Sequence, residues 1–321
     1  MTADDTPAED ASPAEAAGAD ETAPIAAAPV ADTVVDDVAE ESVAAIPADS
    51  TGRVLVTGTT GGIGRAIAVQ LAKKGVKLVL HCRDEKAGES MVAELRQTFD
   101  GADIELVTAD LSSQAETTAL AQGILDKHPS LAAVINNAGV YPGARALTDD
   151  GIELAMAVNH VAPFMLTQLL LPVLEADHGG RVVNVNSFMH KRASINFEDL
   201  QSEKDYSPTR AYARSKLADL MTTYMWSRKL SDTKVTINAY NPGIVRTKML
   251  GGAAGPLAGL IAKSPKSAAT TAVFLATSPR IRGVTGCYYA ATGSTKASSK
   301  DSLNKDLQGE MWTATEALIK N

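Results

Sequence analysis

The side-chain pair in this sequence with the clearest chemical potential is Tyr212 and Lys216, four residues apart. Both fall in a segment with helical spacing, and positions i and i+4 share one face of a helix, so the phenol and the ammonium would be neighbours. A nearby cation stabilises phenolate. We therefore expect the pKa of Tyr212 to fall from about 10 toward neutrality, as a general acid/base requires. The spacing also arises by chance, so the pair gains meaning only from its companions.

A glycine-rich turn is the second feature with chemical meaning. The apolar run Val54-Leu55-Val56 leads into residues 57–64 (TGTTGGIG), and a segment of helical spacing follows at once. Glycines let the backbone approach a pyrophosphate, and a helix N-terminus offers free N–H groups to phosphates. Such a turn can also serve tight packing alone. Strand, turn and helix in immediate succession nevertheless favour nucleotide binding, although the spacing Gly-x-x-x-Gly-x-Gly differs from Gly-x-Gly-x-x-Gly.

The end of the second apolar run bears on which nucleotide would bind. This run ends in residues 80–84, LHCRD, where dinucleotide folds place an acid for the adenosine ribose or an arginine for a 2′-phosphate. Arg83 there, with Arg65 early in the first helical segment, favours NADP over NAD because each guanidinium can bind phosphate. Asp84 is the counter-evidence, since a register error of one residue would place an acid at that position. His81 is interpreted as strand packing.

The elements that must position these residues alternate between two types. Short apolar runs occur at 54–56, 77–80, 104–107, 133–135, 181–185 and 235–237. Between them lie segments of helical spacing, for example Ile63–Lys74, Lys86–Thr98, Ser113–Lys127, Gly151–Ala176 and Arg210–Leu230. Alternating strands and helices predict an α/β fold with a parallel sheet covered on both faces. Pro163 and Pro172 predict a kink or break in the long segment after Gly151.

The first 50 residues differ from the rest. Residues 1–50 hold eight Asp and five Glu but no Lys or Arg, a net charge of −13, whereas the whole chain carries −8 and residues 51–321 therefore +5. Without aromatic residues, this Ala- and Pro-rich head cannot bury enough apolar surface to offset the entropy of ordering. We expect a disordered acidic tail over 1–50 and a single folded domain over 51–321.

Composition excludes several classes of protein. Two cysteines, Cys82 and Cys287, are too few for a disulfide scaffold or a Cys-rich zinc site, and no metal site is expected. The absence of a run of about 18 apolar residues argues against a membrane span. The acidic N-terminus resembles neither a secretory signal nor a transit peptide, which indicates a cytoplasmic protein. The body lacks a Lys/Arg run, so nucleic acid is not an expected partner.

Taken together, the motifs resemble those of the short-chain dehydrogenase/reductase family. They occur in that family's order over about residues 52–290: Thr57–Gly64, Asp110-Leu111, Asn136-Asn137-Ala138-Gly139, Asn159, Ser187, Tyr212-x-x-x-Lys216 and 241–247 (NPGIVRT). Singly, each could be a turn or capping residue. Four features resemble the retinol-dehydrogenase-like branch: Cys82-Arg83-Asp84, Asn159-His160, 197–204 (FEDLQSEK) and Trp312 near the C-terminus.

The resemblance implies a Rossmann-like, doubly wound domain of about seven parallel strands and an NADP(H)-dependent oxidoreductase that interconverts a carbonyl and an alcohol by hydride transfer. It assigns catalytic roles to Tyr212 as acid/base, Lys216 as ribose ligand, Ser187 as substrate-orienting hydroxyl and Asn159 as part of a proton relay. Asp110 and Leu111 would border the adenine, and Thr247 would bind the nicotinamide carboxamide. The full cofactor-binding set is Gly58, Thr60, Gly62, Ile63, Gly64, Arg65, Arg83, Asp110, Leu111, Asn137, Gly139, Tyr212, Lys216, Pro242, Gly243, Val245 and Thr247.

Alternatives remain open at this stage. One is a cofactor-binding regulatory or scaffold protein without turnover; another is a double-bond reductase on the same fold, against which Ser187 argues. The branch suggests a hydrophobic carbonyl or alcohol substrate, with pocket walls near 140–145, 188–195 and a flap over 247–265. A monomer, homodimer or tetramer would each be compatible. One departure from the family is Asn186-Ser187 where Ser-Ser is common, which leaves the second serine in place.

Overall fold

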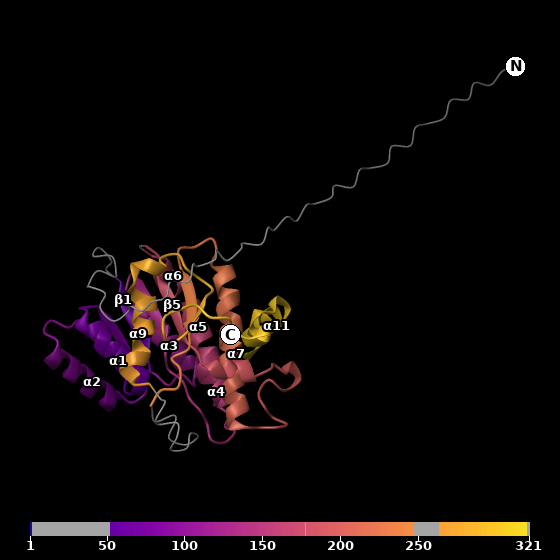
Figure 1. Ribbon diagram of the computed structural model, residues 1–321, viewed down its shortest axis with the longest axis horizontal. Coiled ribbons are helices and arrows are strands. Elements are labelled where there is room, and N and C mark those ends of the chain that lie inside the picture. The colour runs from indigo at the N-terminus through magenta and orange to yellow at the C-terminus, as the bar shows by residue number, and fades with distance from the viewer. Residues whose placement is uncertain (2–51, 177, 247–262, 320–321) are drawn as a thin grey trace. The chain divides into compact units, whose positions relative to one another are not determined.

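The computed structural model describes Met1 and residues 52–176, 178–246 and 263–319 (Figure 1). Within these ranges, seven strands form one sheet in the order β3-β2-β1-β4-β5-β6-β7, and every neighbouring pair is parallel. The strands are β1 (Arg53–Thr57), β2 (Leu78–Cys82), β3 (Ile104–Thr108), β4 (Leu131–Asn136), β5 (Arg181–Val185), β6 (Thr236–Tyr240) and β7 (Tyr288–Tyr289). This order is Rossmann-like and doubly wound, as the sequence predicts. The acidic tail lies outside the described residues.

Helices connect the strands and cover both faces of the sheet. The helices are α1 (Gly62–Lys73), α2 (Glu85–Thr98), α3 (Gln114–Lys127), α4 (Leu154–Met156), η1 (Ala157–Val161), α5 (Ala162–Leu169), α6 (Leu171–Glu175), η2 (Phe188–Arg192), η3 (Phe197–Asp199), α7 (Pro208–Lys229), α9 (Pro265–Thr277), η5 (Pro279–Ile281), α10 (Lys300–Leu303) and α11 (Lys305–Leu318). The helices predicted from Ile63, Lys86, Ser113 and Arg210 correspond to α1, α2, α3 and α7 within two residues at each end. Their sequence periodicity was therefore sufficient to locate them.

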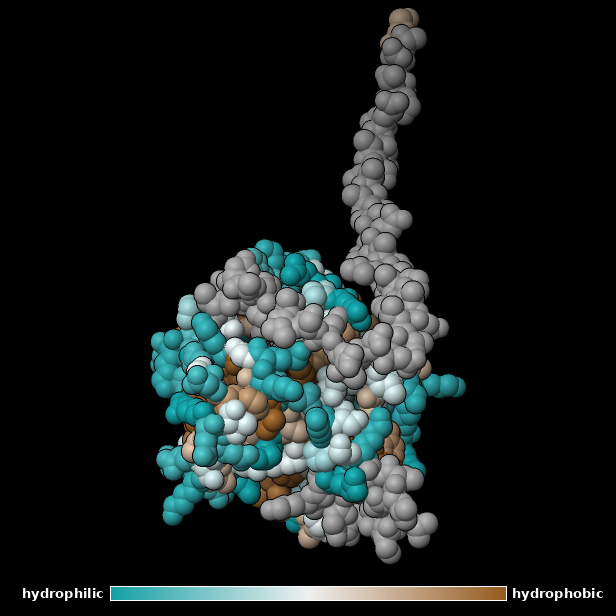
Figure 2. Space-filling view, turned by 60° about the vertical axis from the view of Figure 1, so that its left-hand side comes forward, coloured by the Kyte–Doolittle hydropathy of each residue, from teal (hydrophilic) through white to brown (hydrophobic). Residues whose placement is uncertain are grey.

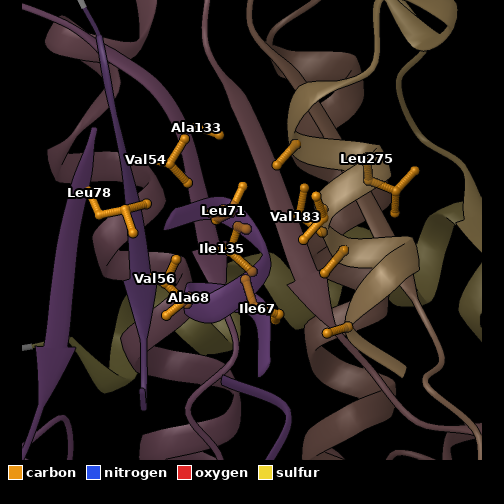
Figure 3. Packing of buried hydrophobic residues seen from close by; sticks show 14 of the residues in the cluster. Val54, Val56, Ile67, Ala68, Leu71, Leu78, Ala133, Ile135, Val183 and Leu275 are labelled. Atoms are coloured by element: carbon orange, nitrogen blue, oxygen red, sulfur yellow. The ribbon is translucent and has the colours of Figure 1, made fainter. Parts of the chain in front are cut away.

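Strand side chains alternate between two buried layers. Val54 and Val56 of β1 pack with α1 and α9 in one cluster, which Figure 3 shows from close by. Leu55, between them, belongs to a second cluster with residues of α3 and α5. Because both faces of the strand are buried, β1 reads as a continuous apolar run instead of an alternating one. The same double burial explains the apolar character of the neighbouring strands.

The segment after Gly151 is interrupted, as its prolines predict, and it consists of four short helices. Short α4 runs into the π-helix η1, after which α5 begins, and Pro163 lies in the first turn of α5. Pro172 likewise lies in the first turn of α6. Proline is tolerated there because the N–H groups of a first helical turn have no intrahelical acceptor. The sequence predicts the interruptions and does not predict the π-helix.

Hydrophilic residues cover much of the molecular face shown in Figure 2. In the described part of the chain, Met1, Leu147 and Leu303 are the exposed large apolar residues. Over the same part, no helix combines the length and apolar character needed to span a bilayer.

Candidate active site

A cavity of about 490 Å³ lies at the carboxyl ends of the strands, beside the point where the strand order reverses between β1 and β4. Doubly wound sheets bind their ligands at this place because the connections after neighbouring strands leave in opposite directions there. The lining residues described are Gly58, Thr60, Gly61, Gly62, Ile63, Gly64, His81, Cys82, Arg83, Ala109, Asp110, Leu111, Asn137, Ala138, Gly139, Val140, Val158, Val185, Asn186, Tyr212, Lys216 and Pro242. The glycine turn and the Tyr–Lys pair thus share one cavity.

The glycine turn is shaped by close backbone contacts. Gly58 and Gly62 have φ values of 71° and 54°, in the left-handed region that glycine adopts without strain. A Cβ on Gly64 would lie 2.1 Å from the Gly58 oxygen and 2.4 Å from Nδ2 of Asn137. That Nδ2 donates to the carbonyl oxygens of Thr57 (2.8 Å) and Gly58 (3.1 Å). Asn137 therefore braces the turn that places the N-terminus of α1 at the cavity.

Of the two arginines expected near the adenosine, Arg83 is among the described residues that line the cavity and Arg65 is not. The Arg83 side chain is 75% exposed at the cavity rim, and its Nη1 lies 3.9 Å from the Asp110 carboxylate. Arg65, on α1, is ion-paired with Glu94 of α2 and is not among the described lining residues. Its position on the helix directs it toward α2. The prediction that Arg65 lies at the cofactor is thus not supported by this arrangement.

Asp84, which could also have faced the cofactor, is bonded to the start of α2. Its carboxylate accepts the N–H of Ala87 at 2.9 Å and caps the N-terminus of α2. Capping side chains of this kind stabilise a helix by satisfying an otherwise unpaired N–H. The acid is therefore engaged by α2, and Arg83 is the side chain of this pair that lines the cavity.

His81 has a larger part in the site than strand packing. Its Nε2 lies 3.0 Å from the Ala109 oxygen, and its Nδ1 lies 3.4 Å from the Gly58 nitrogen. Because a carbonyl can only accept, Nε2 carries the proton and Nδ1 accepts from Gly58. Burial lowers the pKa of His81, which favours this neutral form. The ring ties the glycine turn to the end of β3, a link between distant segments that local sequence spacing does not reveal.

Tyr212 lines the cavity, whereas Ser187, whose side chain lies close to the Tyr212 phenol, is not among the described lining residues. Tyr212 lies near the start of α7, and its ring centroid is 5.3 Å from that of Tyr141. Burial raises the pKa of Tyr212 above 10, while a hydrogen bond with the Ser187 side chain opposes the shift. The expected lowering of this pKa is wrong for the protein chain alone. Burial is the largest influence, and Asp219 and Tyr141 act in the same direction.

Lys216 lies one turn beyond Tyr212 and is 5% exposed. Its Nζ donates to the main-chain oxygen of Val185 at 2.8 Å, at the end of β5. Burial lowers the pKa of Lys216, and the negative charge of Asp219 opposes this effect. An ammonium has three N–H donors, so this contact leaves donors for a ligand in the cavity.

Asn159 lies in the π-helix η1 and is fully buried. Its Nδ2 donates to the Val140 oxygen (2.9 Å) and to the Ser215 hydroxyl (3.0 Å), and its Oδ1 accepts the Val140 N–H at 2.8 Å. The side chain thus fixes the loop after β4 against α7. Single π-helical turns frequently occur at functional sites.

The remaining predicted residues divide into two groups. Thr60, Ile63, Leu111, Gly139 and Pro242 all line the cavity. Gly243 and Val245 follow Pro242 but are not among the described lining residues; Val245 instead pairs with Lys263 in an isolated bridge. Thr247 and most of the predicted flap over 247–265 lie outside the described residues.

Comparison with known proteins identifies this arrangement. Residues 52–254 match the short chain dehydrogenase family. The chain belongs to that family and is an oxidoreductase. Its relatives include retinol dehydrogenase 14 of Mus musculus, 36% identical over 285 residues that cover 83% of this chain and 85% of the relative. Retinol dehydrogenase 13 of Homo sapiens is 32% identical over 290 residues, covering 87% and 86%. Within the family, the chain therefore lies in the retinol-dehydrogenase-like branch, as its motifs predict.

Solved structures share the fold. An uncharacterised protein from Mycobacterium paratuberculosis is 28% identical with a TM-score of 0.69, over 85% of this chain and 95% of that one. The Pseudomonas aeruginosa RhlG/NADP active-site complex is 27% identical with a TM-score of 0.62, over 76% and 96%.

The family's nicotinamide cofactor fits the residues of this cavity. Helix α1 begins at Gly62, and its N-cap residue, Gly61, has no side chain that could accept the N–H groups of the first turn. These N–H groups, with the positive end of the helix dipole, suit a pyrophosphate. No Cβ could be accommodated at Gly64 beside them.

Proposed function

We propose that this protein is an NADP(H)-dependent oxidoreductase that interconverts a hydrophobic aldehyde or ketone and its alcohol, with Tyr212 as the acid/base. The observation that carries the proposal is one cavity lined by both the glycine turn and the Tyr212–Lys216 pair, with the Ser187 side chain close to the Tyr212 phenol. When bound, the cofactor supplies or accepts the hydride.

The chain's own groups would manage the proton and the substrate oxygen. With its pKa raised by burial, Tyr212 is protonated at neutral pH and can donate to a carbonyl oxygen during reduction. The Ser187 hydroxyl, already close to the phenol, can bond the same oxygen and orient it. Lys216 can donate to ribose hydroxyls. The Asn159 side chain is occupied by Val140 and Ser215, so any role in a proton relay would involve its main-chain carbonyl.

The preference for NADP is supported by the division of roles between two neighbouring residues. Arg83 is exposed at the rim, where a guanidinium could bind a 2′-phosphate. Asp84 caps α2, which occupies the acid that would otherwise favour the ribose hydroxyls of NAD. The NADP complex of RhlG, a relative in fold, is consistent with this preference.

The substrate class is supported by the cavity wall and by the relatives. Val140 and Val158 line the cavity beside Tyr212, and Tyr141 contacts the Tyr212 ring. Apolar and aromatic walls of this kind suit hydrophobic ligands. The curated relatives are named retinol dehydrogenases, so retinal belongs in any test panel.

The deciding experiment compares the wild type with Tyr212→Phe. Each protein is titrated with NADPH by nicotinamide fluorescence and then assayed with retinal and other hydrophobic aldehydes and ketones. We expect the variant to bind NADPH normally and to lose about 10²–10⁴-fold in kcat, the usual contribution of a general acid. Undiminished turnover by the variant would refute the role of Tyr212, and no turnover by the wild type on any carbonyl would refute the proposed reaction.

A further inference from the structure

A third ionisable side chain continues the helical face that carries Tyr212 and Lys216. Asp219 follows Lys216 by three residues on α7, and side chains at i, i+4 and i+7 share one face of a helix. Asp219 is only 2% exposed, and it is not among the described residues that line the cavity. A buried carboxyl is costly to a fold unless it is paired. A buried carboxyl one turn beyond Lys216 therefore requires a partner.

Asn186 connects this acid to the reacting groups. Its Nδ2 donates to Asp219 Oδ2 and to the main-chain oxygen of Lys216, each at 2.8 Å. Its Oδ1 accepts the N–H of Ser187, also at 2.8 Å. Asn186 is 2% exposed, so these bonds are shielded from water. One amide thus joins the backbone of Ser187, the helix at Lys216 and the carboxyl group, which a serine hydroxyl with a single donor could not do.

The charges around Lys216 make Asp219 its counter-charge. Among the described groups, the carboxylate of Asp219 is the charge that favours the ammonium of Lys216 against burial. His160 of η1 has its pKa lowered to about 3 by burial and by the charge of Lys216, so it is neutral. Tyr212, whose pKa is raised by burial, is an uncharged phenol at neutral pH. Lys216 in turn favours the ionised form of Asp219.

We propose that Asp219 is a positioning residue of the active site. Through Asn186 it fixes Ser187 relative to α7, and its carboxylate keeps Lys216 charged without touching the cofactor cavity. This inference rests on the proposed function for its kinetic readout, and on the two side-chain contacts of Asn186 for its structural basis.

The test is Asp219→Asn, which removes the charge and preserves the shape. The matched control is Asp232→Asn, the same change at an exposed residue just beyond the C-terminus of α7. Losing the carboxylate lowers the pKa of both Lys216 and Tyr212, because Asp219 raises each of them. Carbonyl reduction needs both groups protonated. We therefore expect the alkaline limb of its pH–rate profile to move to lower pH.

NADPH affinity should remain near the wild-type value in Asp219→Asn, and the control should match the wild type in every respect. A merely structural role would lower kcat without moving the pH limb. An unmoved limb would therefore overturn the proposal. If Asp219→Asn does not fold, Asp219→Ser, which is smaller and also uncharged, takes its place with the same expectation.

A second readout separates this inference from the proposed function. Acetylation of Lys216 by acetic anhydride as a function of pH, followed by mass spectrometry, reports the lysine pKa without turnover. We expect labelling of Lys216 to begin at lower pH in Asp219→Asn than in the wild type or the control. If the wild type reduces no carbonyl, the proposed function fails, but the labelling of Lys216 still tests whether Asp219 keeps this lysine charged. An unchanged labelling curve would overturn the role of Asp219.

Discussion

Replacing Gly64 by alanine is the sharpest test of the glycine turn. The added Cβ would lie 2.1 Å from the Gly58 carbonyl oxygen and 2.4 Å from Nδ2 of Asn137. Neither atom can yield easily, since one is backbone and the other donates to two carbonyl oxygens. The turn must therefore open by about an ångström to restore ordinary van der Waals separation.

The expected cost follows from these contacts. Overpacking costs about 1–3 kcal/mol, and weakening the two Asn137 hydrogen bonds adds about 1 kcal/mol. A total of about 3 kcal/mol lowers the Tm of a domain of this size by about 10 °C. Since the displaced turn also forms the phosphate end of the cavity, NADPH binding should weaken by at least about tenfold, or 1.4 kcal/mol.

Two other glycines provide matched controls. A Cβ on Gly61 would meet nothing within 4 Å, yet Gly61 lines the cavity, so Gly61→Ala should keep its Tm and lose NADPH affinity. Gly123, within α3, also has open space, so Gly123→Ala should keep its NADPH affinity, and its Tm should not fall because alanine is the better helix former. Thermal unfolding followed by circular dichroism and NADPH fluorescence titration measure the two quantities. A Gly64→Ala protein with wild-type Tm and wild-type NADPH affinity would refute the reasoning.

Three further predictions concern other parts of the chain. Arg83→Asp should weaken NADPH at least about tenfold more than NADH, because only NADPH carries the 2′-phosphate; equal losses in fluorescence titrations would place Arg83 away from the adenosine. The pKa of Asp219 is raised by burial from 3.8 to about 6, so its protonated form stabilises the fold, and this contribution is complete below pH 4 and lost as the pH rises through 6. It amounts to about 3 kcal/mol, and the difference in Tm between the wild type and Asp219→Asn should change across that range; a constant difference would contradict the assignment. We also propose that residues 51–321 form the catalytic domain, since the family match begins at residue 52; deletion of 1–50 should leave Tm and turnover intact, and unfolding of the shortened chain would disprove it.

The sequence predicted most of the framework because its signals are local. The apolar runs specify strands buried on both faces, and the glycines of residues 57–64 specify a turn that the structure places at the cavity. Tyr212 and Lys216 could be paired because four residues along a helix fix their relative position. Asp219 continues the same helical spacing, so its place on this face of α7 can also be predicted from the sequence.

Other features depend on contacts between distant segments and could not be read from spacing. Arg65 faces Glu94 because of how α1 lies against α2. The ring of His81 reaches both Gly58 and Ala109 because three strand ends converge. The direction of the Tyr212 pKa shift also required the fold, since burial, its largest cause, depends on every segment packed around the phenol.

The π-helix η1 lets one helical segment contact both the loop after β4 and an aromatic cluster in the core. A π-helical turn holds one residue more than an α-helical turn, so it rotates everything beyond it by about 100° relative to what comes before. Asn159 thereby reaches the loop at Val140, while Phe164, five residues later, packs its ring against Trp226 and Trp312. The extra residue of the π-helical turn thus sets the angle between the helical face that carries Asn159 and the face that carries Phe164. An α-helical turn in place of η1 would rotate Phe164 away from the two tryptophans or Asn159 away from Val140.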